Sequence, residues 1–188
     1  MHAGSLEHVS EFLGVEGSAH RALPPSELVE KLDAILAAAQ RYLRAFPPEQ
    51  ISATVPRREQ RDMRHLGYHV FAIVDDLINI KEGAPYIQGN GPVPDSIRSF
   101  DDIVAYGDGV RGKLRAWYAV QPRELWATVR TTTYGAFTMH WYMERATWHT
   151  AQHSRQLVEM LRSAGIDAPD VLSATFFSGL PMPQAVWD

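Results

Sequence analysis

Apolar residues recur every three to four positions in four long stretches of this chain, which is the spacing of one face of an α-helix. The clearest stretch begins at Pro24 and runs to about Phe46, where two consecutive prolines follow. Proline stops a helix because it lacks a backbone N–H and clashes with the preceding turn. The same spacing predicts three further helices, at about residues 57–82, 99–118 and 138–164.

Residues at the ends of these stretches support the predicted limits. Gly83 and Gly165 follow the second and fourth helices, where glycine is favoured as a C-cap. Ser99 opens the third helix with an aspartate three residues later, a variant of the capping box. Pro122 opens a segment that we expect to hold one helical turn, and the β-branched residues of 129–135 favour an extended conformation.

Four long helices with short to medium connections predict an all-α protein folded as a four-helix bundle. We expect residues 24–165 to form the bundle, and residues 1–23 to be an N-terminal extension with a short helix at 6–14. Residues 166–188 form a C-terminal tail. The tail is expected to pack back onto the bundle because exposed apolar residues at this density cost solubility, and its large apolar side chains are Phe176, Phe177, Leu180 and Trp187.

Composition narrows the function classes. The net charge is −4, and the arginines are scattered among acidic residues, with the densest basic run at 57–64. This pattern gives no nucleic-acid footprint. The absence of cysteine excludes disulfides, thiolate ligands and a cysteine nucleophile. We find neither a signal-peptide pattern nor an apolar run of membrane-spanning length, so we expect no membrane partner and a cytoplasmic setting.

Two pairs of histidines, His65/His69 and His149/His153, are spaced four residues apart within predicted helices. Residues at this spacing share one face of a helix, so each pair can present two imidazoles to one point. Two such helices facing each other could build a histidine-rich metal site in the core of a bundle. The alternative is that these are ordinary surface or core histidines.

The best-supported ligand set is His69, His149 and His153, because His69 lies within the apolar stripe of its helix and the other two lie in the middle of theirs. His65 stays open as a fourth ligand, as an acid/base group beside the metal or as a polar residue near the end of the bundle. Imidazole nitrogens suit several divalent ions, so the sequence does not choose the metal, although zinc and nickel come first.

The segment around the second pair offers a candidate anchor for a substrate. Arg145 lies one turn before His149 and faces roughly the same way, so it could bind a carboxylate. An ion pair with a neighbouring helix is the alternative. The pair lacks the glutamate of the HExxH motif, so a general base would have to be His65, Asp76 or the substrate itself.

Several neighbours of the second pair have two interpretations each. Trp141 and Trp148 either line a pocket or belong to the core, and the core is the commoner place for aromatic residues of a bundle. Gln152 and Arg155 either support the ligands or lie on the surface.

Two segments together resemble the DinB/YfiT-like superfamily: RDMRHLGYHVFAIVDDL at 61–77 and ERATWHTAQHSRQLVEML at 144–161. The resemblance extends over roughly residues 24–165. It implies a four-helix bundle that holds a metal through one histidine of the second helix and an HxxxH pair of the last. In this chain those ligands would be His69, His149 and His153.

The resemblance also implies a range of activities. Members of the superfamily include transferases and isomerases that use mycothiol or bacillithiol, and metal-dependent hydrolases. The closing segment GLPMPQAVWD is similar to a subgroup in which such a domain follows a glutaredoxin-like domain. Because this chain has no cysteine, we expect no redox role of its own.

We therefore expect a thiol-dependent transferase or a hydrolase of small molecules. Its cofactors would be a divalent metal and, for the transferase, a low-molecular-weight thiol. The alternatives are a non-catalytic stress or resistance protein that binds a metal or a small molecule, and an oligomeric structural protein whose histidines are incidental. A homodimer stays open.

Overall fold

A computed structural model describes residues 22–56, 61–80 and 86–187 of the chain. Within these residues the structure is mostly helical, with one two-stranded antiparallel sheet. The α-helices are α2 (Pro25–Ala45), α3 (Met63–Ile78), α4 (Phe100–Ala119) and α5 (Met139–Ser163). The strands are β1 (Val129–Thr132) and β2 (Gly135–Thr138), and the short 3-10 helices are η1 (Pro48–Ser52), η2 (Arg123–Ala127) and η3 (Ala174–Phe177). The helix expected at 6–14 lies outside the described residues.

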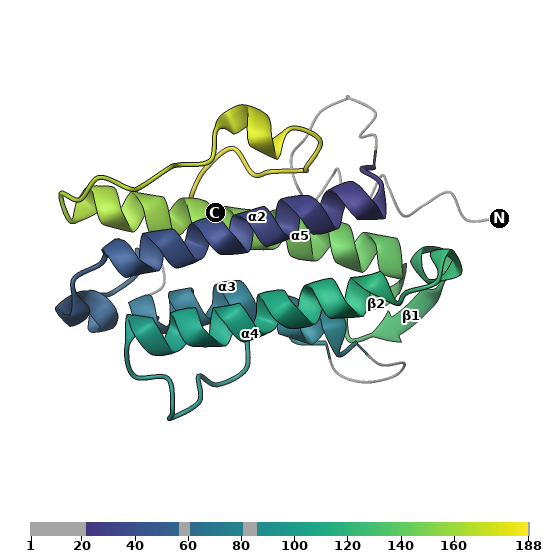
Figure 1. Cartoon of the computed structure of the whole chain (residues 1–188), viewed down its shortest axis with the longest axis horizontal. Coiled ribbons are helices and arrows are strands. Elements are labelled where there is room, and N and C mark those ends of the chain that lie inside the picture. Colours follow the sequence, from purple (N-terminus) through teal and green to yellow (C-terminus); the bar gives the residue numbers. More distant parts are fainter. Residues whose placement is uncertain (1–21, 57–60, 81–85, 188) are drawn as a thin grey trace.

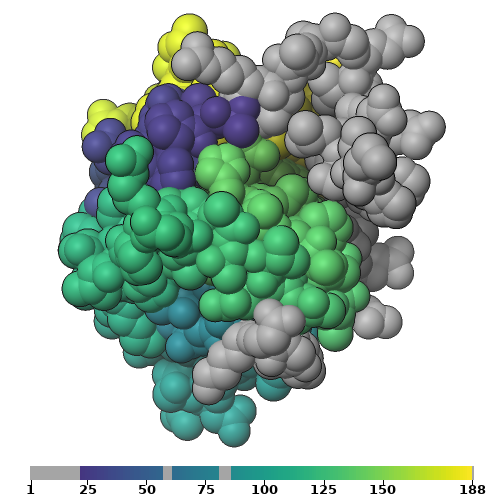
Figure 2. Space-filling model, turned by 90° about the vertical axis from the view of Figure 1, so that its right-hand side faces the viewer, coloured from purple at the N-terminus to yellow at the C-terminus, as the bar shows by residue number. Residues whose placement is uncertain are grey.

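The four α-helices lie in two layers (Figure 1). Helix α2 packs along α5, and α3 packs along α4; the layers meet where α3 contacts α5 and α2 contacts α4. The C-terminal tail, yellow in Figure 1, returns over the outer side of α2 and α5. Viewed from the end that carries the hairpin, the connection between α4 and α5 covers the middle of the molecule (Figure 2). None of the described helices has the length and apolar character needed to cross a membrane.

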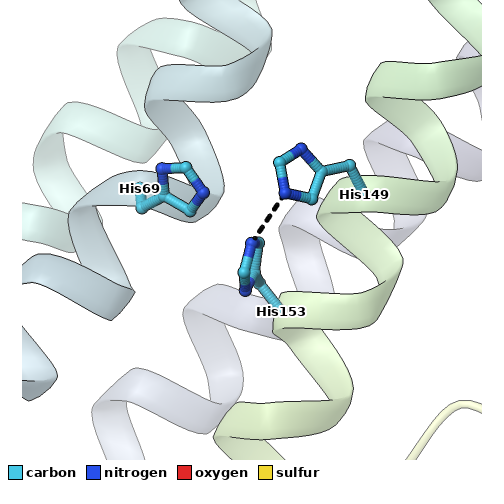
Figure 3. A group of neighbouring side chains, drawn as sticks. All are labelled: His69, His149 and His153. Atoms are coloured by element: carbon cyan, nitrogen blue, oxygen red, sulfur yellow. Dashed lines mark hydrogen bonds between the residues drawn. The ribbon is translucent and has the colours of Figure 1, made fainter. Parts of the chain in front are cut away.

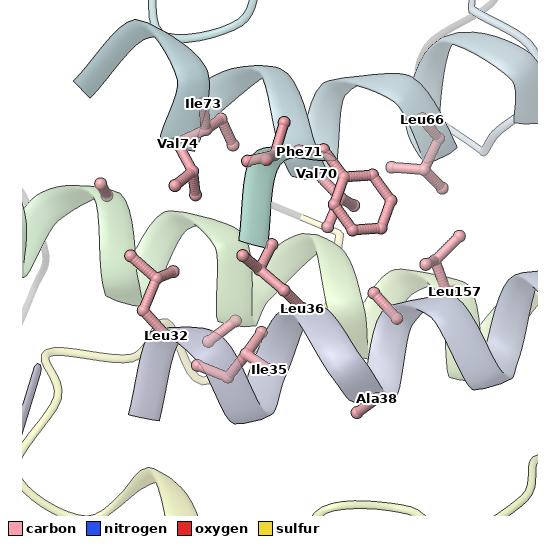
Figure 4. Close-up of a cluster of buried hydrophobic side chains, with 14 of the residues drawn as sticks. Leu32, Ile35, Leu36, Ala38, Leu66, Val70, Phe71, Ile73, Val74 and Leu157 are labelled. Atoms are coloured by element: carbon pink, nitrogen blue, oxygen red, sulfur yellow. The ribbon is translucent and has the colours of Figure 1, made fainter. Parts of the chain in front are cut away.

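The core lies between these layers and is built mainly from aliphatic side chains, with Phe71 among them (Figure 4). The apolar positions of α2 that recur every three to four residues all face it, as the sequence pattern predicts. Side chains of α3 and α5 meet those of α2 there. The following are fully buried: Leu32, Ile35 and Leu36 of α2, Val70, Ile73 and Val74 of α3, and Leu157 of α5. The two helices that carry the paired histidines are therefore held together by a continuous apolar core.

Local capping residues set most of the helix ends at the predicted places. Ser99 and Asp102 form the full capping box at the start of α4. The side chain of Thr138 accepts a hydrogen bond from the backbone N–H of Trp141 at the start of α5. Gly165 follows the last residue of that helical turn with a φ of +73°, a left-handed conformation in which glycine is not strained.

The predicted start of the second long helix is wrong. Helix α3 begins at Met63, after Asp62, whose carboxylate accepts the backbone N–H of His65. The residues just before it are extended: the backbone N–H of Val55 donates to the carbonyl of Arg61 at 3.0 Å. This pairing between separated residues competes with helix formation and is invisible to local periodicity. At the other end Asn79 is the cap residue, and the predicted cap at position 83 lies outside the described residues.

The hairpin and the tail agree only in part with the elements predicted from the sequence. The extended segment predicted at 129–135 contains β1, but its partner strand β2 was not predicted, so the all-α description leaves out a small hairpin. In the tail, Leu180 is buried as expected. The other three large apolar side chains, those of Phe176, Phe177 and Trp187, are half-buried and pack against the core.

Candidate metal centre

Three histidines from two helices converge on one point. His69 of α3 faces His149 and His153 of α5 (Figure 3). Each ring offers one nitrogen, and the three nitrogens all lie within 4.8 Å of one another. The Nε2 atoms of His149 and His153 are 3.0 Å apart. The structure thus brings together the three side chains that the spacing singled out, in a group that could hold a metal ion.

The orientation of His69 is fixed by a loop. Its Nδ1 lies 3.0 Å from the carbonyl oxygen of Gly89. Because a carbonyl only accepts, Nδ1 must carry the hydrogen, which leaves the lone pair on Nε2. The backbone N–H of Gly89 in turn donates to Oδ2 of Asp76 at 2.6 Å. The N–H and the carbonyl of Gly89 therefore link two side chains of α3 that lie seven residues apart, and the carbonyl aims the imidazole of His69.

Position 89 accepts only glycine. Its φ is +73°, and a Cβ built there would lie 2.8 Å from the backbone nitrogen of Ile73 and 2.9 Å from Nδ1 of His69. Both the left-handed backbone and this close approach exclude other side chains. Partial burial raises the pKa of Asp76 above its ordinary value, although the hydrogen bond from Gly89 opposes the rise.

The two histidines of α5 are supported unequally. His153 has its Nδ1 2.7 Å from Oε1 of Gln156, so Nδ1 carries the hydrogen and Nε2, which lies 3.0 Å from Nε2 of His149, keeps the lone pair. The Nδ1 of His149 is buried and has no hydrogen-bond partner among the described residues. Burial, helped by the neighbouring His153 and His69, holds the pKa of His149 well below its ordinary value. His149 is therefore neutral near pH 7, the form in which imidazole binds metals.

The donor set fits a divalent ion. Two nitrogens bound to a tetrahedral zinc at about 2.0–2.1 Å lie roughly 3.3 Å apart. The observed separation of 3.0 Å between the Nε2 atoms of His149 and His153 needs only a small adjustment. Imidazole nitrogens suit several divalent ions, so this group of three could hold an ion without determining which one.

Arg145 lies one turn before His149, with aromatic rings around its guanidinium group. The guanidinium carbon lies 5.1 Å from the ring centre of Tyr134, 5.5 Å from that of Trp141 and 5.3 Å from that of Trp148. Among the described residues no carboxylate lies within salt-bridge distance of it, and its buried Nε has no hydrogen-bond partner. The ion pair considered as an alternative is therefore not seen in this part of the chain.

Tyr86 is a further polar group beside Arg145, and the sequence pattern did not single it out. It is 3% exposed, and its hydroxyl has no hydrogen-bond partner among the residues that the structure describes. Burial raises the pKa of Tyr86, and the positive charge of Arg145 opposes that rise. No sequence signal marks it, because it lies in a loop whose fold depends on distant contacts.

The remaining candidate, His65, is placed at the N-terminal end of α3. Its Nδ1 lies 2.7 Å from Oδ1 of Asp62, and its side chain is 41% exposed. Partial burial acts to raise the pKa of Asp62, but the hydrogen bonds from His65 outweigh it and the pKa is lowered. The group that could hold an ion consists of the other three histidines.

Comparison with known proteins adds no assignment. No model of a known protein family matches the sequence, and no curated protein matches it significantly. The function must therefore be argued from the convergence of the histidines and from the groups around them.

Proposed function

We propose that this chain is a metal-dependent enzyme of the DinB-like superfamily that acts on small molecules. Thiol-dependent transfer is the first reaction class, and hydrolysis is the second. The observation that carries the proposal is the convergence of one ring nitrogen each from His69, His149 and His153 within 4.8 Å. The helix arrangement supports a DinB-like four-helix bundle, and the resemblance of segments 61–77 and 144–161 to that superfamily points the same way.

The ion, for which we propose zinc or nickel, would supply a Lewis-acid centre that lowers the pKa of a water or thiol bound to it. The three histidines would bind the ion through neutral imidazole rings. Burial of His69, which is 5% exposed, and partial burial of the pair facing it limit access of bulk water. A metal-bound water or thiol is one way to generate a nucleophile near neutral pH without cysteine, which is why we place the chemistry here.

Arg145 is the proposed anchor for an anionic substrate. Aromatic rings surround its guanidinium group, while its buried Nε has no hydrogen-bond partner among the described residues. A carboxylate binds such donors in the plane of the guanidinium group. The positive charge of Arg145 acts on the hydroxyl of Tyr86, and this hydroxyl would supply a further hydrogen-bond donor to the substrate. Because Arg145 is one turn from His149, a substrate anchored there lies next to the metal.

Cobalt-substituted protein titrated with mycothiol, bacillithiol and glutathione tests this proposal. A thiol that binds as thiolate should give an intense thiolate-to-cobalt absorption, which His153→Ala should abolish. Arg145→Gln should keep that band and weaken the binding of small carboxylates such as succinate. Arg162→Gln is the matched control, because Arg162 lies on the same helix and its side chain is 62% exposed.

The outcomes separate the candidate functions. If none of the three thiols changes the cobalt spectrum, the transferase is ruled out in favour of the hydrolase or of a non-catalytic binding protein. If the protein binds no divalent ion, the proposal as a whole fails.

A further inference from the structure

The end of the C-terminal tail is hydrogen-bonded to the face of α5 next to the ligands. We call residues 183–186 the closing strap. Three side chains from two successive turns of α5 donate to its backbone carbonyls. Gln152 donates to the carbonyls of Ala185 (2.9 Å) and Val186 (2.6 Å), Arg155 to those of Pro183 (2.8 Å) and Gln184 (3.2 Å), and Gln156 to that of Val186 (2.9 Å). Every carbonyl of the strap therefore accepts a hydrogen bond from α5.

One of these side chains also touches a candidate ligand. The Nε2 of Gln156 donates to Val186, while its Oε1 lies 2.7 Å from Nδ1 of His153. An amide group has donors at one end and an acceptor at the other. If it were flipped, its oxygen would face the carbonyl of Val186, and that contact would be repulsive because both atoms only accept hydrogen bonds. The strap thus determines which end of Gln156 meets the imidazole.

We propose that the closing strap positions His153 for metal binding through Gln156. This inference rests on the proposed metal site. With Oε1 facing it, Nδ1 of His153 carries the hydrogen and Nε2 keeps the lone pair that points toward His149. Groups that hold a ligand in this way commonly change metal affinity 10–100-fold when they are removed. Gln156 is a positioning residue, since it reaches the metal only through His153.

Four full-length variants separate positioning from simple packing of the tail. Gln156→Leu removes both contacts of the amide. Gln152→Leu removes two strap hydrogen bonds but has no described contact with a ligand. Arg155→Ala loosens the far end of the strap, and Arg155→Lys restores a donor there. Metal affinity is measured by competition with a chromophoric chelator, and the melting temperature of each metal-free protein shows that it is folded.

Positioning predicts that Gln156→Leu binds zinc and cobalt about 10–100-fold more weakly than the wild type. Arg155→Ala should also lose affinity, although Arg155 contacts no ligand, and Arg155→Lys should recover part of the loss. The inference is overturned if Gln156→Leu binds these ions no more weakly than Gln152→Leu does while both remain folded.

A second readout does not depend on the metal. Nitrogen NMR of the metal-free protein reports which nitrogen of His153 carries the hydrogen. The wild type should show mainly the Nδ1–H form, and Gln156→Leu should lose that preference. A wild type that binds no ion overturns the proposed function, whereas an unchanged tautomer of His153 in Gln156→Leu overturns the positioning contact itself.

Discussion

The two histidine pairs of this chain have the same spacing and different surroundings. In α5, His149 and His153 both point into the space between the layers. In α3 only His69 does so, because His65 lies in the first turn, where Asp62 caps the helix and holds its ring. Spacing of i and i+4 puts two side chains on one face, but the position of the helix end decides whether both can reach the same site.

The comparison also shows how differently each ligand is supported. His69 depends on the loop that carries Gly89, twenty residues away in sequence. His153 depends on a neighbour in its own helix, which is held by the strap. His149 has no such partner among the described residues, and its fixed place near the middle of a long helix is its main constraint.

Replacing a ligand should have the largest effect on metal affinity, and it tests most directly whether the two histidines of α3 differ in role. His69→Ala and His149→Ala should each lower metal affinity by more than the roughly 100-fold expected for a supporting group, because a coordinating nitrogen is lost outright. His65→Ala should keep the wild-type affinity. Competition with a chromophoric chelator measures all three. Equal losses in the His65 and His69 variants would show that the two α3 histidines act alike.

Metal should stabilise the fold because its ligands lie on helices far apart in sequence. At an excess of about 100 Kd the gain is about 2.7 kcal/mol, or roughly 5–10 °C in a chain of this size. Thermal melts with and without chelator should show this shift in the wild type and in His65→Ala, and no shift in His149→Ala. Chelation that leaves every melting temperature unchanged would place the ion outside the core.

The loop that supports His69 should be nearly as sensitive as the strap. Asp76→Ala removes the acceptor of the Gly89 N–H and should weaken metal binding about tenfold, at the lower end of the range for supporting groups. Asp76→Asn keeps an oxygen acceptor and should stay close to the wild type. Zinc affinity of the two variants, measured side by side, tests whether the backbone of Gly89 aims the ring; equal affinities would refute that role.

Protonation of His149 should have the smallest effect, and it applies to the metal-free protein. Its pKa in the folded state lies below the ordinary 6.5, with burial as the first cause and His153, His69, Arg145 and Arg61 as further causes. The unfolded chain therefore takes up the proton first. The contribution of neutral His149 to the free energy of unfolding is fully present above pH 6.5. It decreases below pH 6.5, by at most about 1.4 kcal/mol per pH unit.

Urea unfolding of the metal-free wild type and of His149→Gln, from about pH 8 to about pH 5, measures this slope. The variant should show the shallower dependence on pH. A variant slope equal to that of the wild type would mean that another group carries the proton uptake.

The predictable parts of this structure are those that local sequence controls. The limits of α4 and α5 follow from Ser99 and Thr138, whose side chains cap their own helices. The start of α3 escaped prediction because the backbone of Val55 hydrogen-bonds to that of Arg61, six residues away, and β2 escaped because a hairpin depends on its partner strand.

The site divides in the same way. The convergence of His69, His149 and His153 was predicted from helical spacing. Their supports were not, because Gly89 and Val186 reach them from a distant loop and from the end of the tail. A glutamine three residues after a candidate ligand, as Gln156 is, was the one local signal of a supporting group.

The most direct test of the account is metal analysis of protein purified without an affinity tag, followed by X-ray absorption on the bound ion. The account predicts one zinc or nickel per chain, with three imidazole nitrogens at about 2.0–2.1 Å. Protein that takes up neither ion after incubation with both, or that keeps its full metal content when His69 and His149 are both replaced by alanine, would contradict it.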